Sequence, residues 1–172
     1  MKIRIMVFLA SLLCTIGGHA HVIVGFSPEG SAQKLVINTL NIARHSINLM
    51  GYSFTSPEVV KALIAAKRRG VDVRVVLDSK ANQGRASVAA INLLVNAGIE
   101  VRTVDNYRIM HDKVAIIDGV TTQTGSFNYS RAAQRSNSEN VVVMWQMPEV
   151  AQVYLDHWQS RWAQGQVWQS RY

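Results

Sequence analysis

Apolar residues along this chain recur at two different spacings, and together these spacings predict alternating strands and helices. Short apolar runs rich in β-branched residues indicate strands, and apolar residues three or four positions apart indicate helices. The segment Ser56-Pro57-Glu58 is a typical helix start, because it supplies an N-cap serine, a proline at the first helical position and an acid in the first turn. The predicted strands cover residues 22–26, 47–54, 71–77, 99–104, 113–117, 120–124 and 140–145, and the predicted helices cover 32–43, 57–69, 85–97 and a segment that begins at 148.

This order of elements predicts the fold class. Strands that alternate with helices indicate an α/β protein with parallel pairing, because a parallel connection needs a crossover. The last three strands have no long helix between them, so some antiparallel pairing is also expected. We therefore predict an α/β/α sandwich with a mixed, largely parallel central sheet. No linker, repeat or low-complexity tract divides the chain, and residues 21–172 are predicted to form a single domain.

The most informative stretch for function runs from His111 to Ser130, where polar residues interrupt apolar runs at regular spacings. Side chains alternate faces along a strand, so His111 and Lys113 are expected on one face and Asp118 on the other. Downstream, Ser126 and Asn128 are again two positions apart. Two polar pairs that converge on one pocket would suit an anionic phosphate.

These residues resemble the signature of the phospholipase D superfamily, H-x-K-x4-D followed by G-S-x-N. The chain has His111, Lys113 and Asp118 at that spacing, then Gly125-Ser126-Phe127-Asn128, with Glu139 in the segment that follows. Short length and a single copy of the motif resemble the small bacterial endonucleases of the Nuc type within that superfamily. The resemblance implies the phospholipase D-like fold over nearly the whole chain after residue 20.

The resemblance also implies a mechanism. His111 would attack phosphorus and form a phosphohistidine intermediate, which divides one difficult step into two. Lys113 would neutralise phosphoryl oxygens, and the side chains at 126 and 128 would donate hydrogen bonds to them. Glu139 would orient the imidazole, by analogy with family members, whereas Asp118 would have an architectural role because of its opposite parity. The predicted catalytic set is His111, Lys113, Ser126, Asn128, Glu139 and Asp118.

A single histidine is poorly suited to act both as nucleophile and as acid for the leaving oxygen. Superfamily members with two motif copies use one histidine for each task, and this chain has one copy. We therefore predict a homodimer in which His111 of each subunit reaches a shared site. The acidic residues are dispersed along the chain, which predicts catalysis without a metal or another cofactor, with Lys113 in the charge-neutralising role.

Charge and the N-terminal segment suggest a partner and a location. The formal net charge is +7, which suits a polyanion such as nucleic acid but equally describes an ordinary basic surface. Arg108, Arg131 and Arg135 flank the motif segments and are candidate phosphate contacts, with solvated surface charge as the alternative. Residues 1–20 are typical of an export signal, which predicts a periplasmic or secreted protein without stable membrane insertion after cleavage, and leaves a retained anchor as the alternative.

Three functions remain open from the sequence. The leading one is an exported, metal-independent, non-specific endonuclease that hydrolyses DNA, with RNA left open as a substrate. The second is a phospholipase D or phosphatidyl transferase that applies the same chemistry to lipid headgroups. The third is a nucleic-acid-binding module with an inactive site, against which the intact His111, Lys113 and Asn128 argue. The small size favours the nuclease, because little chain is left over for the extra loops of a lipid pocket.

Overall fold

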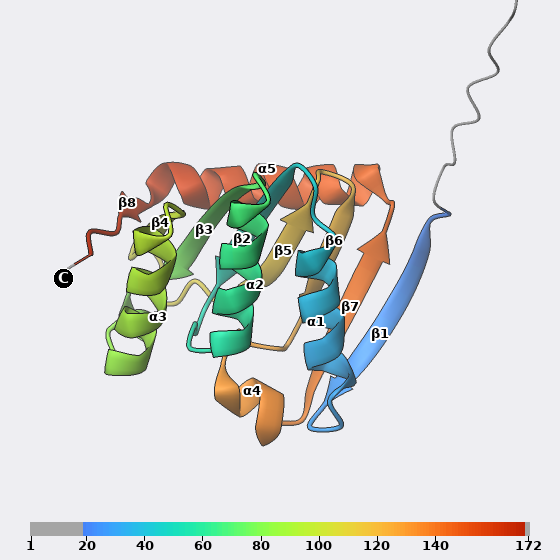
Figure 1. The fold of residues 1–172 in the computed structure, drawn as a ribbon, viewed down its shortest axis with the longest axis horizontal. Helices are drawn as coiled ribbons and strands as arrows, with labels where there is room; N and C mark the ends of the chain where they lie inside the picture. The colour runs from blue at the N-terminus through green and yellow to red at the C-terminus, as the bar shows by residue number, and fades with distance from the viewer. Residues whose placement is uncertain (1–18, 171–172) are drawn as a thin grey trace, which may run out of the picture.

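The computed structural model describes residues 19–170 of the 172-residue chain. Its centre is an eight-stranded sheet in the order β1-β7-β6-β5-β2-β3-β4-β8 (Figure 1). The strands are β1 (His21–Ser27), β2 (Ser46–Gly51), β3 (Asp72–Asp78), β4 (Glu100–Val104), β5 (Lys113–Ile117), β6 (Thr121–Gly125), β7 (Glu139–Trp145) and β8 (Gln166–Val167).

Helices cover both faces of this sheet, which confirms the predicted α/β/α sandwich. On one face lie α1 (Ser31–Asn41), α2 (Pro57–Arg68) and α3 (Arg85–Asn96), and on the other lies α5 (Pro148–Gln164) (Figure 1). Each face of the sheet has its own hydrophobic core, and successive residues of β2 point into one core or the other. Leu49 packs among α1–α3, and Met50 packs toward α5. The indole of Trp158 on α5 ties that helix to the sheet through a 3.0 Å hydrogen bond from Nε1 to the Leu49 carbonyl.

The sheet is mixed as expected, but its pairing is not largely parallel. Only β2–β3 and β3–β4 pair in parallel, through crossovers that contain α2 and α3. All the other neighbouring strands pair antiparallel. For β5 and β6 the reason is the connection: a tight turn joins them, in which Asp118 and Gly119 both have positive φ, and a tight turn can join only antiparallel strands.

The predicted strands and long helices are all present, with ends that differ by a few residues. The strand expected over 47–54 ends earlier, at Gly51, and the residues after it enter the candidate active site. Three short elements were not predicted: the 3₁₀ turn η1 (Lys80–Asn82), the helix α4 (Arg131–Arg135) and the strand β8. The 3₁₀ turn and β8 have three residues or fewer, and α4 is little more than one turn with the sequence Arg-Ala-Ala-Gln-Arg, so none of them contains an apolar pattern that could be recognised.

Residues 1–18 of the predicted export signal lie outside the described residues. None of the helices within residues 19–170 combines the length and the apolar character needed to cross a bilayer.

Candidate active site

The candidate active site is a pocket at one edge of the sheet, where β5 and β7 begin and β6 ends. The pocket has a volume of about 350 Å³. Five of the six predicted catalytic residues line it, together with the glycine of the G-S-x-N segment: His111, Lys113, Gly125, Ser126, Asn128 and Glu139. Residues separated by up to 28 positions in the sequence therefore meet in one cavity.

Lys113 is the buried cation of this pocket. It is the first residue of β5 and only 5% of its surface is exposed. Its Nζ donates a 2.7 Å hydrogen bond to the main-chain carbonyl of His111 and lies 5.3 Å from the centre of the Tyr52 ring. Burial lowers the pKa of the Lys113 ammonium, while the negative charges of Asp112 and Glu139 act in the opposite direction. An anion that entered the pocket would add to these negative charges and would further favour the charged form of the ammonium.

The His111 imidazole, in contrast, is exposed at the mouth of the pocket. Its ring packs edge-on against Tyr52, with 4.6 Å between ring centres and an interplanar angle of 64°. Tyr52 could not be predicted from the motif, because it lies 59 positions away from His111 and matches no part of the motif. The pairing of β2 with β5, in which Gly51 is opposite Lys113, brings the two aromatic rings together.

Ser126 is positioned to donate its hydroxyl proton. Its Oγ accepts hydrogen bonds from the main-chain N–H of Asn140 at 3.0 Å and from the side-chain amide of Asn140 at 3.3 Å. Because both bonds use the oxygen as acceptor, the O–H proton remains available to a substrate oxygen. Asn140 is a second residue that could not be predicted from the motif, since no motif position marks it.

Asn128 and Gly125 line the pocket next to Ser126. The Oδ1 atom of Asn128 is buried without a hydrogen-bond partner, although the residue lines the pocket. A buried carbonyl oxygen without a partner is costly unless a ligand donates a hydrogen bond to it, and a phosphodiester oxygen, which only accepts, would bind the amide nitrogen of this side chain instead. Gly125 has a φ of 142°, and a Cβ at this position would lie 2.3 Å from the carbonyl oxygen of Asn140. Only glycine allows β6 to approach β7 this closely beside Ser126.

Glu139, the first residue of β7, lines the pocket but does not make the predicted contact with the imidazole. Its carboxylate accepts a 2.9 Å hydrogen bond from the side-chain amide of Asn137. Among the hydrogen bonds of residues 19–170, none joins Glu139 to His111. The structure therefore gives Glu139 an electrostatic influence on Lys113, and its orienting role toward His111 stays a prediction.

Asp118 lies outside the pocket, at the far end of β5 from Lys113. Its carboxylate accepts hydrogen bonds from the main-chain N–H groups of Arg44, His45 and Ser46, at distances of 2.7–3.2 Å. These bonds fasten the loop between α1 and β2 to the β5–β6 turn. The position agrees with the architectural role expected from its parity, and it removes Asp118 from the set of residues that can contact a phosphate in the pocket.

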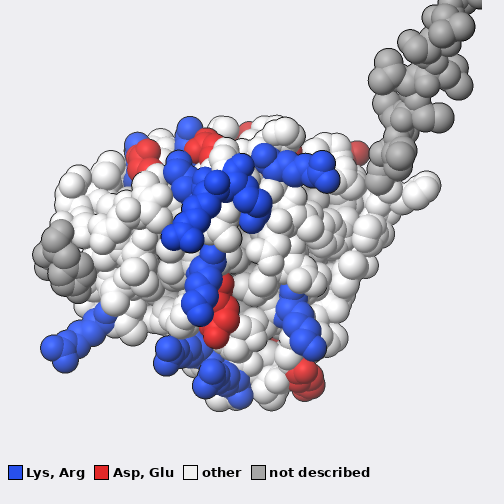
Figure 2. Space-filling model, viewed as in Figure 1, with Lys and Arg blue, Asp and Glu red and all other residues white. Residues whose placement is uncertain are grey.

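The three candidate phosphate-binding arginines also lie outside the pocket. Arg108 is exposed in the loop between β4 and β5, and Arg135 is exposed at the end of α4. Arg131, at the start of α4, borders a separate apolar hollow of about 600 Å³ between α2 and α3. On the face that carries α1–α3, lysine and arginine side chains follow α2 and continue toward the edge near α4 (Figure 2). Their contact with a substrate stays a prediction.

Within residues 19–170, no group of three or more His, Cys, Asp or Glu side chains is placed to hold a metal ion. The carboxylate of Asp112, next to the motif histidine, instead lies 3.4 Å from the Nε2 atom of His157 on α5. Catalysis without a metal stays a prediction from the sequence.

Comparison with known proteins agrees with this fold. Residues 36–162 match the family model described as "Cardiolipin synthase, PLD-like domain". The chain is 37% identical over 136 residues to a protein of Rickettsia bellii named phospholipase D, which covers 79% of this chain and 66% of the relative. It is 34% identical over 134 residues to the mitochondrial cardiolipin hydrolase of Mus musculus, which covers 78% of this chain and 59% of that protein. The chain thus spans about two thirds or less of the length of these relatives.

Fold and site together define the class: the chain belongs to the phospholipase D superfamily of phosphodiesterases. Among solved structures it is similar to Nuc from Salmonella typhimurium, a phospholipase D family member, with 54% identity and a TM-score of 0.87 over 88% of this chain and 100% of that one. NucT from Helicobacter pylori has the same fold, with a TM-score of 0.78 at 22% identity. The resemblance to the Nuc type inferred from the motif is therefore confirmed.

Proposed function

We propose that the protein is an exported, metal-independent, non-specific endonuclease that hydrolyses DNA through His111, with RNA left open as a substrate. The observation that carries this proposal is the pairing, in one pocket, of an exposed imidazole with a buried ammonium. The first group can reach phosphorus, and the second can neutralise the oxygens of a phosphodiester. Ser126 offers a free hydroxyl proton to the same oxygens.

The reaction proceeds in two steps. In the first, a ring nitrogen of His111 attacks phosphorus, a P–N bond forms, and the P–O bond to the leaving strand breaks. The leaving oxygen takes a proton from an acid. In the second, water attacks the phosphohistidine, gives up a proton to a base, and releases the other strand end and the free imidazole. The ammonium of Lys113 and the donor at 126 stabilise the charge that develops on phosphorus in both steps.

The pocket contains one histidine, and the reaction needs a nucleophile and an acid at the same phosphate. We propose that His111 of the partner subunit supplies the acid in a two-fold homodimer. Its exposed position supports this, since a buried ring could not reach a second subunit. One imidazole then attacks phosphorus, and the other donates the proton to the leaving oxygen.

Nucleic acid is the proposed substrate because the similarity to Nuc extends over that whole chain at 54% identity. Because other relatives are named phospholipase D and cardiolipin hydrolase, a lipid headgroup is the alternative substrate. The same two-step chemistry would serve either phosphodiester, so only the substrate distinguishes them.

The test uses the purified chain without residues 1–20, incubated with plasmid DNA, RNA and phosphatidylcholine vesicles in the presence of EDTA. We expect cleavage of DNA, its complete loss in His111→Ala, and its retention in the matched variant His45→Ala, an exposed histidine remote from the pocket. Release of headgroup without cleavage of nucleic acid would establish the lipid alternative. Binding of DNA without cleavage would instead support the inactive binding module.

Export is proposed from residues 1–20 and is tested separately. Expression of the full chain in a bacterium, followed by osmotic shock, is expected to release a shortened protein with the periplasmic fraction. A full-length product in the membrane fraction would indicate a retained anchor.

A further inference from the structure

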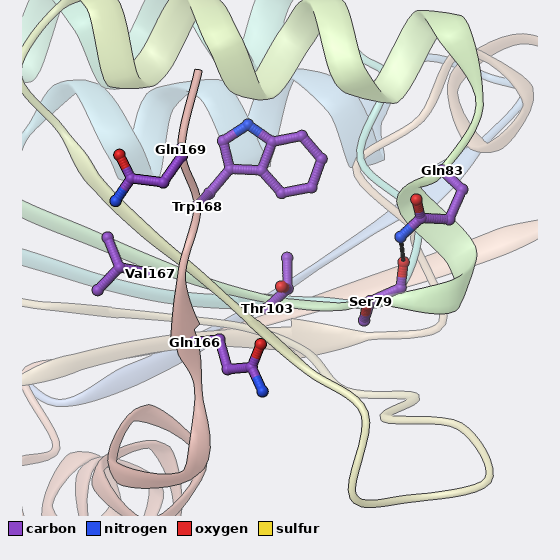
Figure 3. Close-up of a pocket in the computed structure, with 7 residues that line it drawn as sticks. All are labelled: Ser79, Gln83, Thr103, Gln166, Val167, Trp168 and Gln169. Atoms are coloured by element: carbon purple, nitrogen blue, oxygen red, sulfur yellow. Dashed lines mark hydrogen bonds between the residues drawn. The ribbon is translucent and has the colours of Figure 1, made fainter. Parts of the chain in front are cut away.

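A second polar hollow, of about 300 Å³, lies beside β4 and β8 (Figure 3). It is lined by Ser79, Gln83, Thr103, Gln166, Val167, Trp168 and Gln169. The proposed chemistry uses none of these residues. All seven side chains are uncharged, and they combine three carboxamides, two hydroxyls and an indole.

The hollow has a fixed wall on the C-terminal side. The Trp168 indole Nε1 donates a 2.8 Å hydrogen bond to the side chain of Asn92 on α3, and its main-chain N–H donates to Val101 at 2.8 Å. Gln166 pairs across the strands with Thr103. Because the indole N–H is already bonded, the ring can offer only its apolar surface to a ligand, beside the amide side chains that Figure 3 shows around the opening.

The opposite wall is tied to the candidate active site. Asn82 of η1 donates a 2.7 Å hydrogen bond to the carbonyl of Tyr52, whose ring contacts His111. Asp78, the last residue of β3, accepts hydrogen bonds from the main-chain N–H groups of Ala81 and Met110. The loop that carries one wall of the hollow is therefore held to the segment that leads into the catalytic motif.

Both sites lie at the same edge of the sheet, where β3 and β4 end and β5 begins. The nearest strands of the two sites, β5 and β4, are three strand spacings apart, so the sites are separated by at least ~14 Å. Along the edge between them, Lys80 and Arg108 are exposed, and Ile109 is 50% exposed. A strand that joined the two sites would therefore need to span at least roughly four stacked nucleotides, at ~3.4 Å each.

The chemistry of the lining selects a neutral, planar, polar ligand. Without a cation among the seven lining side chains, the hollow offers no charge to a phosphate. Carboxamides form paired hydrogen bonds with the edges of nucleobases, and aromatic surfaces pack against base planes. Gln83 keeps its carbonyl oxygen available, because its amide nitrogen is bonded to the Ser79 carbonyl at 2.7 Å.

We propose that this hollow is a nucleobase subsite, which binds an unpaired base of the strand whose phosphate occupies the His111 pocket. The inference rests on the proposed nuclease function and adds a substrate class to it, namely single-stranded nucleic acid. A base in a duplex has its hydrogen-bonding edge paired and its faces stacked, so it cannot enter the hollow without being flipped out.

The test measures binding in the His111→Ala background, so that it does not depend on turnover. The probe is a fluorescein-labelled single-stranded oligonucleotide, compared with a series in which one base at a time is removed. We expect one abasic position to weaken binding about tenfold or more, the loss of one bidentate base contact. That penalty should disappear in the double variant Gln166→Ala/Gln169→Ala, whose residues are both exposed, and persist in Gln152→Ala on the opposite face.

Trp168→Ala is avoided as the main test because its indole packs against the core, and thermal melting of the glutamine variants verifies that they fold. An abasic penalty that persists in the double variant, or no penalty at any position, overturns the subsite. Tighter binding of duplex than of single strand overturns it as well. Failure of the nuclease proposal is a different result, an uncleaved substrate with the unmutated protein, and it is read from the cleavage assay alone.

Discussion

The ammonium of Lys113 donates a 2.7 Å hydrogen bond to the main-chain carbonyl of His111. The cation is therefore positioned by the backbone of the same residue whose side chain is the candidate nucleophile. This arrangement leaves the imidazole free to pack against Tyr52 and to point into solvent. The ammonium that would neutralise a phosphate is therefore held in place, whereas the candidate nucleophile is accessible to a substrate.

The first prediction concerns pH. Burial lowers the pKa of Lys113 from its ordinary value of 10.5, so the ammonium loses its proton earlier as the pH rises. Activity that needs the charged form should fall on the alkaline side below pH 10.5. We expect Lys113→Arg to be less active but to lack this alkaline decline, because a guanidinium keeps its proton. Profiles of kcat/KM against pH for the two proteins measure the effect, and identical alkaline limbs would contradict it.

The same shift has a consequence for stability. Between the lowered pKa of the folded state and 10.5, the unfolded chain binds more protons at Lys113 than the folded chain does. The contribution of this residue to the free energy of unfolding should therefore rise with pH across that window. Denaturant unfolding of the unmutated protein and of Lys113→Met at several alkaline pH values isolates the contribution. A difference between them that stays constant with pH would argue against it.

A second pH prediction distinguishes two roles for the nearby carboxylates, an effect on the pKa of Lys113 and the orientation of the His111 ring. Asp112 and Glu139 both raise the pKa of Lys113, the former more strongly, and only Glu139 lines the pocket. Asp112→Asn and Glu139→Gln should each move the alkaline limb to lower pH. A loss of the plateau rate confined to Glu139→Gln would reveal the orienting role toward His111. If the alkaline limb of the pH profile stays at the same pH in both variants, these carboxylates do not influence the pKa of Lys113.

Ser126 provides a test of hydrogen-bond donation. Ser126→Ala should lower kcat by about 10²–10³, the effect of one preorganised donor. Asn140→Ala is the matched control, because it removes the 3.3 Å side-chain bond to Ser126 and keeps the 3.0 Å main-chain bond. We expect that variant to lose much less activity in the same single-turnover assay. Equal losses would assign the serine a structural role only.

Gly125 tests the packing of β6 against β7. Gly125→Ala would place a Cβ 2.3 Å from a main-chain oxygen at a φ of 142°, so we expect a loss of several kcal/mol of folding free energy. Gly119→Ala is the control, since its φ is also positive, at 67°, but nothing lies within 4 Å. That variant should lose only ~1–2 kcal/mol from strain. Thermal unfolding compares the two, and similar losses would contradict the close approach.

A mixing experiment tests the shared site. If each phosphate needs His111 from both subunits, mixed dimers of unmutated and His111→Ala chains are inactive. Activity should then fall as the square of the unmutated fraction after subunit exchange. A linear fall would show that each subunit works alone, and light scattering on the active species checks the dimer itself.

Local features of this protein were predictable from its sequence. The spacing of His111 and Lys113, the Asp118-Gly119 turn and the helix start at Ser56 each depend on neighbours within a few residues. Period-two and period-3.6 patterns follow from backbone geometry, so they identified the strands and the long helices. The opposite parity of Asp118 along its strand also predicts that its side chain lies outside the pocket.

The remaining features depended on contacts between distant segments. Tyr52 meets His111 only because β2 pairs with β5 in one register, and Asn140 meets Ser126 only because β7 pairs with β6. No local pattern encodes which strands become neighbours, since this is decided by which arrangement buries the apolar faces of all the elements together. The sequence by itself therefore determined the chemistry available to this protein, whereas the tertiary structure decided which partners surround it.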